Sequence, residues 1–563
     1  MSQPFPIDPQ AGLASGFGLS RARPWAAVEI WDDLSRLLLF CLLVIAVLTF
    51  RDYGISIDEE VQHIYGKKLL AYYTSGFVDL SAFSFKDLYL YGGLFDLAVA
   101  LLTPISPLAE YDTRHLLCAL CGVVGIAGTW RLGRLLGGPR AGFLAAALLA
   151  LSGVYYGAMF NNTKDVPFAA GMVWTLYFAT RMVLQFPSPR PSSVLKFGLT
   201  LGLSLGIRVG AVLAGVYVVA AALLFLAFML YSDGWRATLA AFGRMVVAML
   251  PAVPVAYGLM AALWPWAVFD VLNPIRALQA FSHIDYLPYQ LETLFNGRLV
   301  SAIDAPALYL PVYLAIKVPE AVLLGLLLAV AFAAAWVWRT VRERRSWRPA
   351  LRYAVVTLAV AFPIASFMLL RPTVYNGIRH FLFVVPPMVV LAAVAFHHLW
   401  NLAEARGHHA VRAVVLGLTV SGVVYGWQLG CLHPNEYVYY NAFVGGAKGA
   451  KGRFELDYWG NSILEAVKQL ESLLELENDG KTPERTYTVV VCGNALAARY
   501  ELPPYLKLVN GVEPLWRNAD FFITFTQDRI CPNLMDGRPI IEILADEVPL
   551  AIVKDRRAPE QQK

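Results

Sequence analysis

Charged residues are scarce in this chain. They make up only 15% of its 563 residues, while 58% are hydrophobic. A soluble globular protein carries about 25% charged residues, so this composition excludes that class and indicates a membrane protein. The net charge of +5 is small for the length. The basic residues are bunched in short loops between apolar runs, which is a topology signal, so we expect no nucleic-acid partner.

Cysteine is sparse as well, and it shows no metal-ligand spacing. The six cysteines are divided between apolar runs and the polar C-terminal part: Cys41, Cys118 and Cys121 in the former, Cys431, Cys492 and Cys531 in the latter. At most one disulfide is expected, and it would lie in the C-terminal part. That part also lacks a phosphate-binding glycine loop and a catalytic triad.

The first long apolar run covers residues 37–50 and follows a polar segment, 1–36. No small-residue cleavage site precedes Arg51, so we interpret the run as an uncleaved membrane anchor and not as a signal peptide. The segment 1–36 is then cytosolic, and Trp25 and Trp31 contribute to the apolar face of an interfacial helix. The chain beyond residue 50 is expected on the outer side.

A second apolar segment, 94–108, is too short to span a membrane, because a spanning helix needs about 20 apolar residues. Asp96, Pro104 and Pro107 also interrupt it, so we interpret it as a helix along the outer interface. The expected spans after it are 116–136, 142–160, 167–184, 196–207, 209–230, 245–263, 319–338, 354–370, 381–397 and 414–429. With this choice every basic loop, including the one from Arg131 to Arg140, falls in the cytosol.

The anchor and these segments give about eleven spans, and an odd count from a cytosolic N-terminus leaves the C-terminus outside. The polar end of the chain contains the helical pattern SILEAVKQLESLLELE and three short apolar runs typical of buried strands, YTVVVCG, DFFITF and PIIEIL. The stretch 445–454 is interpreted as a flexible linker, with an anion-binding loop as the alternative. The sequence therefore predicts an α-helical polytopic membrane protein. It comprises a cytosolic segment 1–36, a membrane domain 37–430 with outer loops 51–115 and 264–318, and an outer α/β domain 431–563.

The stretch RDYGISIDEE, directly after the anchor, carries three consecutive acids. Asp58 and Glu59 fall at the membrane-water boundary, where a carboxylate is partly desolvated and yet reachable from water. We therefore expect catalytic chemistry here. The alternative is three solvated acids in a loop.

The other outer loops collect the remaining candidate groups. Arginine holds phosphate oxygens in a bidentate fork, so we expect these loops to form one substrate-binding site for an anion. Arg208 follows a segment that is short for a span, which suggests a cavity open to the outer face. For each single lysine or arginine, the alternative is a side chain that reaches to the interface. The expected substrate-binding residues are Lys164, Asp165, Arg208, Lys317, Arg371, Tyr375, Arg379 and His380.

The order of these motifs resembles a known family. An Asp-Glu pair opens the first outer loop, NNTKDVP forms the second, and the glycine-rich GLTLGLSLGIRVG ends in a cation. Together they are similar to the C-type membrane glycosyltransferases, in the branch of the protein O-mannosyltransferases and the lipid A aminoarabinose transferases. The resemblance covers about residues 37–429.

This resemblance implies a polyprenyl-phosphate donor carrying one sugar, used at the periplasmic face of a bacterial inner membrane, where the α/β domain would also lie. The acceptor would be a lipid, a glycan or a protein. Asp58 then matches the catalytic carboxylate, and Lys164, Arg208 and Arg379 match contacts to the donor phosphate.

The chemistry suits the residues independently of the resemblance. Asp58 would take the acceptor proton while the acceptor attacks the anomeric carbon from the face opposite the phosphate, with inversion. Glu59 would orient the acceptor, or raise one of the two carboxyl pKa values by like-charge repulsion. A divalent metal between Asp58, Glu59 and Asp165 is an alternative, but a sugar monophosphate has no diphosphate for a metal to bridge, so we expect no cofactor.

Two other classes of protein also have many spans. A transporter or lipid flippase would be expected to show paired halves and charges near the bilayer midplane, whereas this chain shows no internal repeat and its charges collect at one face. A scaffold protein whose tail binds partners would leave the outer cations unexplained. The enzyme interpretation accounts for both observations.

Overall fold

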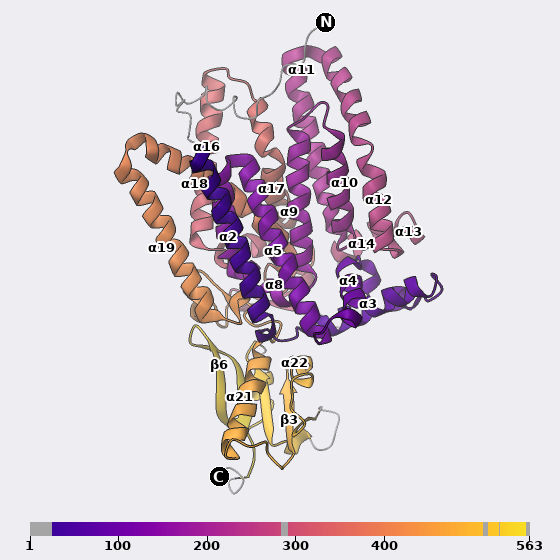
Figure 1. Cartoon of the computed structure of the whole chain (residues 1–563), viewed down its shortest axis with the longest axis vertical. Coiled ribbons are helices and arrows are strands. Elements are labelled where there is room, and N and C mark those ends of the chain that lie inside the picture. Colours follow the sequence, from indigo (N-terminus) through magenta and orange to yellow (C-terminus); the bar gives the residue numbers. More distant parts are fainter. Residues whose placement is uncertain (1–24, 283–290, 510–515, 528–529, 559–563) are drawn as a thin grey trace.

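The computed structural model describes residues 25–282, 291–509, 516–527 and 530–558. A bundle of long helices forms most of the molecule, and a small domain of strands and helices lies at one end of it (Figure 1). The predicted fold class, a helical membrane protein with a C-terminal α/β domain, is confirmed. The long helices of the bundle are α2 (Trp25–Thr49), α5 (Glu110–Gly137), α6 (Pro139–Ala150), α9 (Asp165–Val183), α10 (Pro191–Leu205), α11 (Val212–Met249), α12 (Ala252–Leu263), α16 (Glu320–Arg342), α17 (Leu351–Leu370), α18 (Val385–Arg406) and α19 (His408–Leu432).

Seven helical segments in the described parts of the chain are long and apolar enough to cross a membrane. An eighth qualifies if α6 and the two short helices after it, α7 (Gly153–Tyr156) and α8 (Ala158–Asn161), count as one span bent by 68°. The predicted number of about eleven is therefore not confirmed. Part of the difference lies in α9 and α10, which fall on predicted spans but are not among these segments. Helix α10 is only 15 residues long, and α9, with 19 residues, is long enough but not apolar enough.

One of the seven segments, Val209–Leu263, is 55 residues long, which is far more than a single crossing needs. Gly234 breaks α11 with φ 79° and ψ 173°, and the chain turns back there and returns through α12 (Figure 1). A glycine adopts this positive φ without the steric cost that a side chain adds. The segment therefore consists of two helical arms, at the two places where the sequence predicts separate spans.

The first helix begins earlier than expected. Helix α2 runs without a break from Trp25 into the apolar run, so residues 25–36 are not a separate helix. Trp31 packs against Phe143 and Trp400, with ring centroids 5.5 and 5.6 Å apart. Its ring is thus used for packing between helices. Residues 1–24 lie outside the described part.

Short elements cover one end of the bundle. Helix α4 and the turn after it form an apolar helical segment, Leu94–Ile105, shorter than a span, as expected for 94–108. The backbone N–H groups of Gly93 and Leu94 donate to the carbonyls of Leu263 and Gly206, so α4 packs on the ends of α10 and α12. The elements at this end are α3 (Glu59–Thr74), α4 (Leu94–Leu102), α13 (Trp266–Phe269), α14 (Asn273–Ser282), α15 (Tyr309–Lys317) and the antiparallel pair β1 (Glu292–Phe295) and β2 (Arg298–Ser301).

The C-terminal domain contains a five-stranded mixed sheet in the order β4-β3-β5-β7-β6. Strand β3 is parallel to both β4 and β5, and β7 is antiparallel to β5 and β6. Helix α21 packs on this sheet. Cys492 and Cys531 form a disulfide, a pairing that the sequence left open. The elements are α21 (Ser462–Glu477), β3 (Tyr487–Cys492), α22 (Ala495–Arg499), β4 (Leu506–Leu508), β5 (Phe521–Phe525), β6 (Arg538–Ala545) and β7 (Val548–Asp555).

The segment between α19 and α21 packs against the membrane domain. Tyr437, Tyr440, Phe454 and Trp459 are buried in the same hydrophobic core as the bundle helices. The stretch 445–454 contains a short helix, α20 (Gly446–Ala450), whose Ala447 and Ala450 are buried. The linker interpretation was therefore wrong, because alanine and Phe454 anchor a stretch whose composition suggested flexibility.

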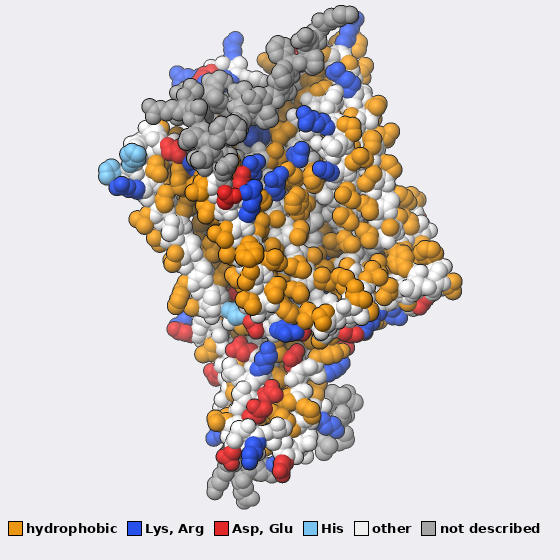
Figure 2. Space-filling model, viewed as in Figure 1, with side chains coloured by type: hydrophobic (Ala, Val, Ile, Leu, Met, Phe, Trp, Pro, Cys, Tyr) orange, Lys and Arg blue, Asp and Glu red, His pale blue; other side chains and the backbone are white. Residues whose placement is uncertain are grey.

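The two ends of the bundle differ in charge. Helix α16 begins at Glu320, whose carboxylate accepts a hydrogen bond from Ala442 N in the segment beside the C-terminal domain, and ends at Arg342. Helix α18 ends at Arg406, and α19 returns from there to the C-terminal domain. Figure 2 shows a broad hydrophobic band between charged regions at both ends, with many Lys and Arg side chains at the end remote from the C-terminal domain.

This arrangement supports a topology prediction. By the positive-inside rule, we expect the basic end in the cytosol and the C-terminal domain outside. A reporter inserted at Gly407 is expected to report the cytosol, and one fused to the C-terminus is expected to report the periplasm. A cytosolic C-terminal reporter would contradict the assignment of Asp58 to the outer face.

Candidate functional site

Asp58 and Arg379, which are 321 positions apart in sequence, form an ion pair. Arg379 Nη1 donates to Asp58 Oδ2 over 2.7 Å. Asp58 is the residue before α3, and Arg379 begins the 3₁₀ helix η8 (Arg379–Val384). The Asp58 side chain is 43% exposed, whereas that of Arg379 is 9% exposed. The carboxylate is thus held by a buried cation and is still open to a substrate.

A second ion pair joins Arg208 and Asp165, with Nη2 2.6 Å from Oδ1. Asn162 fixes this carboxylate, because its side-chain amide donates to Asp165 Oδ2 and its Oδ1 accepts from the Asp165 backbone N–H, both over 3.0 Å. Arg208 lies in the break between α10 and the next helix. The Asp165 carboxylate therefore fixes the orientation of the Arg208 guanidinium.

Lys164 shares an aromatic ring with Arg208. Its ammonium lies 3.7 Å from the centroid of the Tyr91 ring, and the Arg208 guanidinium carbon lies 5.5 Å from the same centroid. Within the described ranges, no carboxylate is within 4 Å of the Lys164 ammonium. Tyr91 was not predicted from the sequence. It fixes two of the three cations at one place.

The charges act on one another. Burial alone would raise the pKa of Asp58, but Arg379 and, next, Lys164 outweigh it and hold this pKa below its usual value. Burial lowers the pKa of Lys164 to about 8, against the opposing effect of Asp96 and Asp58. The carboxylate is thus ionised at neutral pH, but it is a weak base while Arg379 holds it.

Two buried N–H groups of this cluster have no partner. Arg208 Nε and Arg379 Nε are buried and form no hydrogen bond within the described part of the chain. An unsatisfied buried donor costs free energy, about 1–3 kcal/mol, and more when it is charged. A ligand with several acceptor oxygens would satisfy both groups.

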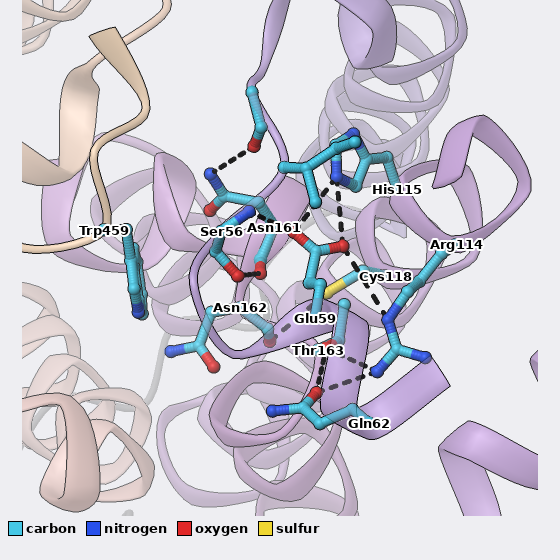
Figure 3. A network of polar contacts seen from close by, with 12 residues as sticks. Ser56, Glu59, Gln62, Arg114, His115, Cys118, Asn161, Asn162, Thr163 and Trp459 are labelled. Atoms are coloured by element: carbon cyan, nitrogen blue, oxygen red, sulfur yellow. Dashed lines mark hydrogen bonds and ion pairs between the residues drawn. The ribbon is translucent and has the colours of Figure 1, made fainter. Parts of the chain in front are cut away.

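Glu59 belongs to a buried polar network with Ser56, His115 and Arg114 (Figure 3). Its carboxylate accepts from the backbone N–H of Ser56 over 2.7 Å and pairs with His115 Nε2 at 3.1 Å. The residue is fully buried. These contacts hold the turn before α3, and the buried carboxylate is not accessible to an acceptor. The catalytic role predicted for Glu59 stays a prediction that no contact supports.

Arg114 of α5 is the centre of the same network (Figure 3). Its Nη2 donates to Asp96 Oδ1 over 2.6 Å, and to Gln62 and Thr163 over 2.8 Å each. Arg114 is fully buried. It therefore ties α3 and α4 to the loop just before Lys164, and so connects the two segments that carry Asp58 and Lys164.

Two predicted substrate-binding residues make other contacts. Lys317 is buried, donates to the carbonyl of Tyr437 over 2.9 Å and lies 3.7 Å from the Tyr440 ring centroid. Arg371 is half-exposed and pairs with Asp304 at 3.5 Å. The structure joins neither of them to the ion pairs of Asp58 and Asp165, so their predicted binding of substrate stays a prediction.

Two other predicted residues do flank the cluster. The Tyr375 ring centroid lies 4.6 Å from the guanidinium carbon of Arg379 and 4.8 Å from the His380 ring. Tyr458, from the segment before α21, lies near enough to Arg379 and Asp165 for their charges to act on its phenol. No sequence pattern indicates Tyr458, because it is distant in the chain from Arg379 and Asp165 and lies among other aromatic residues.

The predicted metal alternative finds no ligand set. Within the described ranges, no three His, Cys, Asp or Glu side chains lie close enough together to hold a metal ion. The three carboxylates considered for it are separated: Asp58 pairs with Arg379, Asp165 with Arg208, and Glu59 with His115. Each is neutralised by a basic side chain of the chain itself.

A family model described as dolichyl-phosphate-mannose-protein mannosyltransferase matches residues 100–258. The match includes Arg114, Lys164, Asp165 and Arg208, and it ends before Arg379. It confirms the resemblance to the C-type membrane glycosyltransferases in the branch of the protein O-mannosyltransferases. The chain matches no curated protein sequence.

Solved structures with similar folds include ArnT from Cupriavidus metallidurans. Its apo form is 15% identical, covers 94% of this chain and 98% of ArnT, and has a TM-score of 0.45. Its form bound to undecaprenyl phosphate is 15% identical, covers 95% and 98%, and has a TM-score of 0.42. The oligosaccharyltransferase AglB from Archaeoglobus fulgidus, in complex with an inhibitory peptide and a dolichol-phosphate, is 13% identical. It covers 86% of this chain and 69% of AglB, with a TM-score of 0.40.

Proposed function

We propose that this C-type membrane glycosyltransferase moves one sugar from a polyprenyl-phosphate donor to an acceptor at the periplasmic face of the membrane, with inversion at the anomeric carbon. The observation that carries the proposal is the cluster of Lys164, Arg208 and Arg379 around the half-exposed carboxylate of Asp58. The matching family is named for a donor of this kind, a sugar on a dolichyl phosphate.

The three cations form a cradle for the donor phosphate. Among the described residues, no carboxylate lies within 4 Å of the Lys164 ammonium, so this ammonium is the first contact for an incoming anion. The unpartnered Nε groups of Arg208 and Arg379 then donate to phosphate oxygens. Charge-assisted hydrogen bonds of this kind contribute about 1.5–3 kcal/mol each. The same cations stabilise the charge that develops on the phosphate as it leaves.

Donor binding also prepares the base. A phosphate on Arg379 neutralises the charge that holds the pKa of Asp58 low, so this pKa rises and the carboxylate becomes a stronger base. Asp58 then takes the proton of the acceptor O–H or N–H as its oxygen or nitrogen bonds to the anomeric carbon. The bond from that carbon to the phosphate oxygen breaks, and its electron pair stays on the phosphate. One displacement inverts the anomeric configuration.

The disulfide supports the outer location. Disulfides persist in oxidising compartments, which include the bacterial periplasm, and are rare in the cytosol. The Cys492–Cys531 bond lies in the C-terminal domain, at the same end of the bundle as α3 (Figure 1), the helix that follows Asp58. This argument is independent of the distribution of basic loops.

A direct assay tests the function. Purified protein in detergent or liposomes is mixed with a polyprenyl-phosphate sugar and candidate lipid, glycan and protein acceptors. The expected result is acceptor-dependent release of free polyprenyl phosphate and a product with the opposite anomeric configuration, measured by NMR. A lipid flippase would instead move intact donor between leaflets without release, and a retained configuration would contradict the single displacement.

Arg208→Ala tests the phosphate cradle. We expect the donor KM to rise about 10-fold or more, because a charge-assisted contact of about 1.5–3 kcal/mol is lost. The matched control is Arg276→Ala. Arg276 also pairs with an aspartate, over 2.7 Å, but it is half-exposed and belongs to α14 outside the cluster. Equal donor kinetics for the two variants would contradict a role for Arg208.

A further inference from the structure

The chain forms an irregular, buried segment over the four residues from Tyr53 to Ser56, directly before the turn at Ile57 and Asp58. Tyr53, Ile55 and Ser56 are 1–3% exposed, and the segment has no helix or strand of its own beyond a bend at Tyr53. Buried backbone N–H and C=O groups need hydrogen-bond partners. This segment must therefore take its partners from other parts of the chain.

Two asparagines of the C-terminal domain provide two of these partners, and Asn161 and Glu59 of the membrane domain provide others. Gly54 N donates to Asn461 Oδ1 over 2.7 Å, and Asn494 Nδ2 donates to the carbonyl of Ile55 over 2.5 Å. Asn461 precedes α21 and Asn494 precedes α22. Both asparagines are buried. They hold the segment from the side of the α/β domain.

The fit between the two parts is close. A Cβ added to Gly54 would lie 2.9 Å from the backbone oxygen of Asn461 and 3.2 Å from Leu464 Cβ. Ile55 packs in a small buried cluster with Leu496 of α22 and Tyr111 of α5. Tyr53 donates from its hydroxyl to Glu436 over 2.8 Å. A shift of the C-terminal domain would therefore move the segment that carries Asp58.

We propose that Asn461 and Asn494 are positioning residues for the transfer reaction: they hold Gly54 and Ile55 so that the Asp58 carboxylate faces Arg379. The inference rests on the proposed function and gives the C-terminal domain a part in it. The cations of the cradle have other supports, since Lys164, Arg208 and Arg379 form no hydrogen bond with either asparagine. Loosening this contact should thus affect the base and spare donor binding.

Asn494→Asp isolates the contact. An aspartate keeps the oxygen that accepts from Ala497 N and caps α22, but it loses the donor to Ile55 and places a negative charge near two carbonyl oxygens. We expect kcat to fall about 10-fold, because a misplacement of about 1 Å costs up to 10²-fold, while the donor KM stays within about twofold. The acid limb of the kcat/KM profile, which reports the donor-free enzyme, should move to higher pH, since a looser Asp58–Arg379 pair lowers the Asp58 pKa less.

Asp520→Asn is the matched control in the same domain. Its carboxylate accepts from Arg485 over 2.9 Å and from Thr488 N and Oγ1 over 2.8 Å each. Asp520 lies directly before β5 and forms no hydrogen bond with the segment 53–56. This variant loses comparable hydrogen bonds inside the C-terminal domain. We expect its kcat and pH profile to match the wild type, which separates positioning from a general loss of domain stability.

Gly54→Ala tests the same contact from the membrane domain and should reproduce the fall in kcat, the unchanged KM and the shifted acid limb. Wild-type kcat and pH profiles for Gly54→Ala and Asn494→Asp, in folded protein, would overturn the inference, as would a donor KM that rises in parallel with the loss of kcat. If these variants behave like the wild type while Asp58→Asn is inactive, only the positioning role fails. If Asp58→Asn is fully active, the assignment of the base to Asp58 fails with it, whereas the proposed function fails only if the wild-type protein releases no polyprenyl phosphate.

Discussion

Asp58→Asn is expected to lower the rate of sugar transfer by about 10² to 10⁴, the usual loss when a general base is removed. Asparagine keeps the size of the side chain and an oxygen that accepts from Arg379, but it does not take the proton of the acceptor. The three cations keep their places, so donor binding should survive. Single-turnover transfer and donor binding, measured separately on purified protein, distinguish the two steps.

Glu60→Gln is the control for this variant. Glu60 is two positions away, is partly exposed and pairs with Arg499 over 3.3 Å. A surface acid changed to its amide usually shifts stability by no more than about 0.5 kcal/mol, and transfer should stay near the wild-type rate. Transfer at the wild-type rate by Asp58→Asn would show that Asp58 is not the general base. The next candidate would be Asp165, the other carboxylate beside the cations.

Much of the architecture could be predicted because it follows from apolar length and loop charge. The anchor, the helical segments and the α/β domain are patterns along the chain, and each is set by residues near one another in sequence. The number of spans is harder to predict, since α10 is short, α9 is long enough but not apolar enough, and the 55-residue segment breaks at Gly234. Length and hydropathy do not separate a short crossing from a buried helix.

The candidate site shows a similar division. Four site residues could be predicted, because a charged residue next to an apolar run is costly to bury and therefore indicates a functional site. They are Asp58, Lys164, Arg208 and Arg379. Glu59 also carries a carboxylate and is the next residue after Asp58. Because it is one position further along the chain, its carboxylate points inward to His115. Sequence position does not reveal this difference, because it depends on α5 lying on that side of α3.

Arg114 was missed for a related reason. It lies in the first part of α5, among residues predicted as an outer loop, where an arginine is unremarkable in sequence. Its function becomes visible only when Asp96, Gln62 and Thr163 converge on it from three other segments. Such a network depends entirely on tertiary structure, and it carries the second large effect that we expect.

Arg114→Leu is expected to destabilise the folded protein by about 3–5 kcal/mol, the cost of removing one partner of a buried ion pair. The carboxylate of Asp96, which is 3% exposed, would lose its cation at 2.6 Å, and that of Glu59 would lose a cation 3.7 Å away. Leucine fills part of the space but offers no donor. Thermal unfolding in detergent, followed by circular dichroism, measures the loss.

Arg134→Leu on the same helix is the matched control. Arg134 pairs with Asp32 over 2.7 Å, a nearly equal distance, but the Arg134 side chain is 38% exposed and that of Asp32 10% exposed. Water reaches this pair, so its loss should cost less stability than the loss of the fully buried Arg114. Adding Asp96→Asn to Arg114→Leu should restore part of the lost stability, because it removes a buried charge that has no partner. If Arg114→Leu unfolds no earlier than Arg134→Leu, burial of Arg114 does not set its contribution, and the link it forms between the Asp58 and Lys164 segments is not what holds them in place.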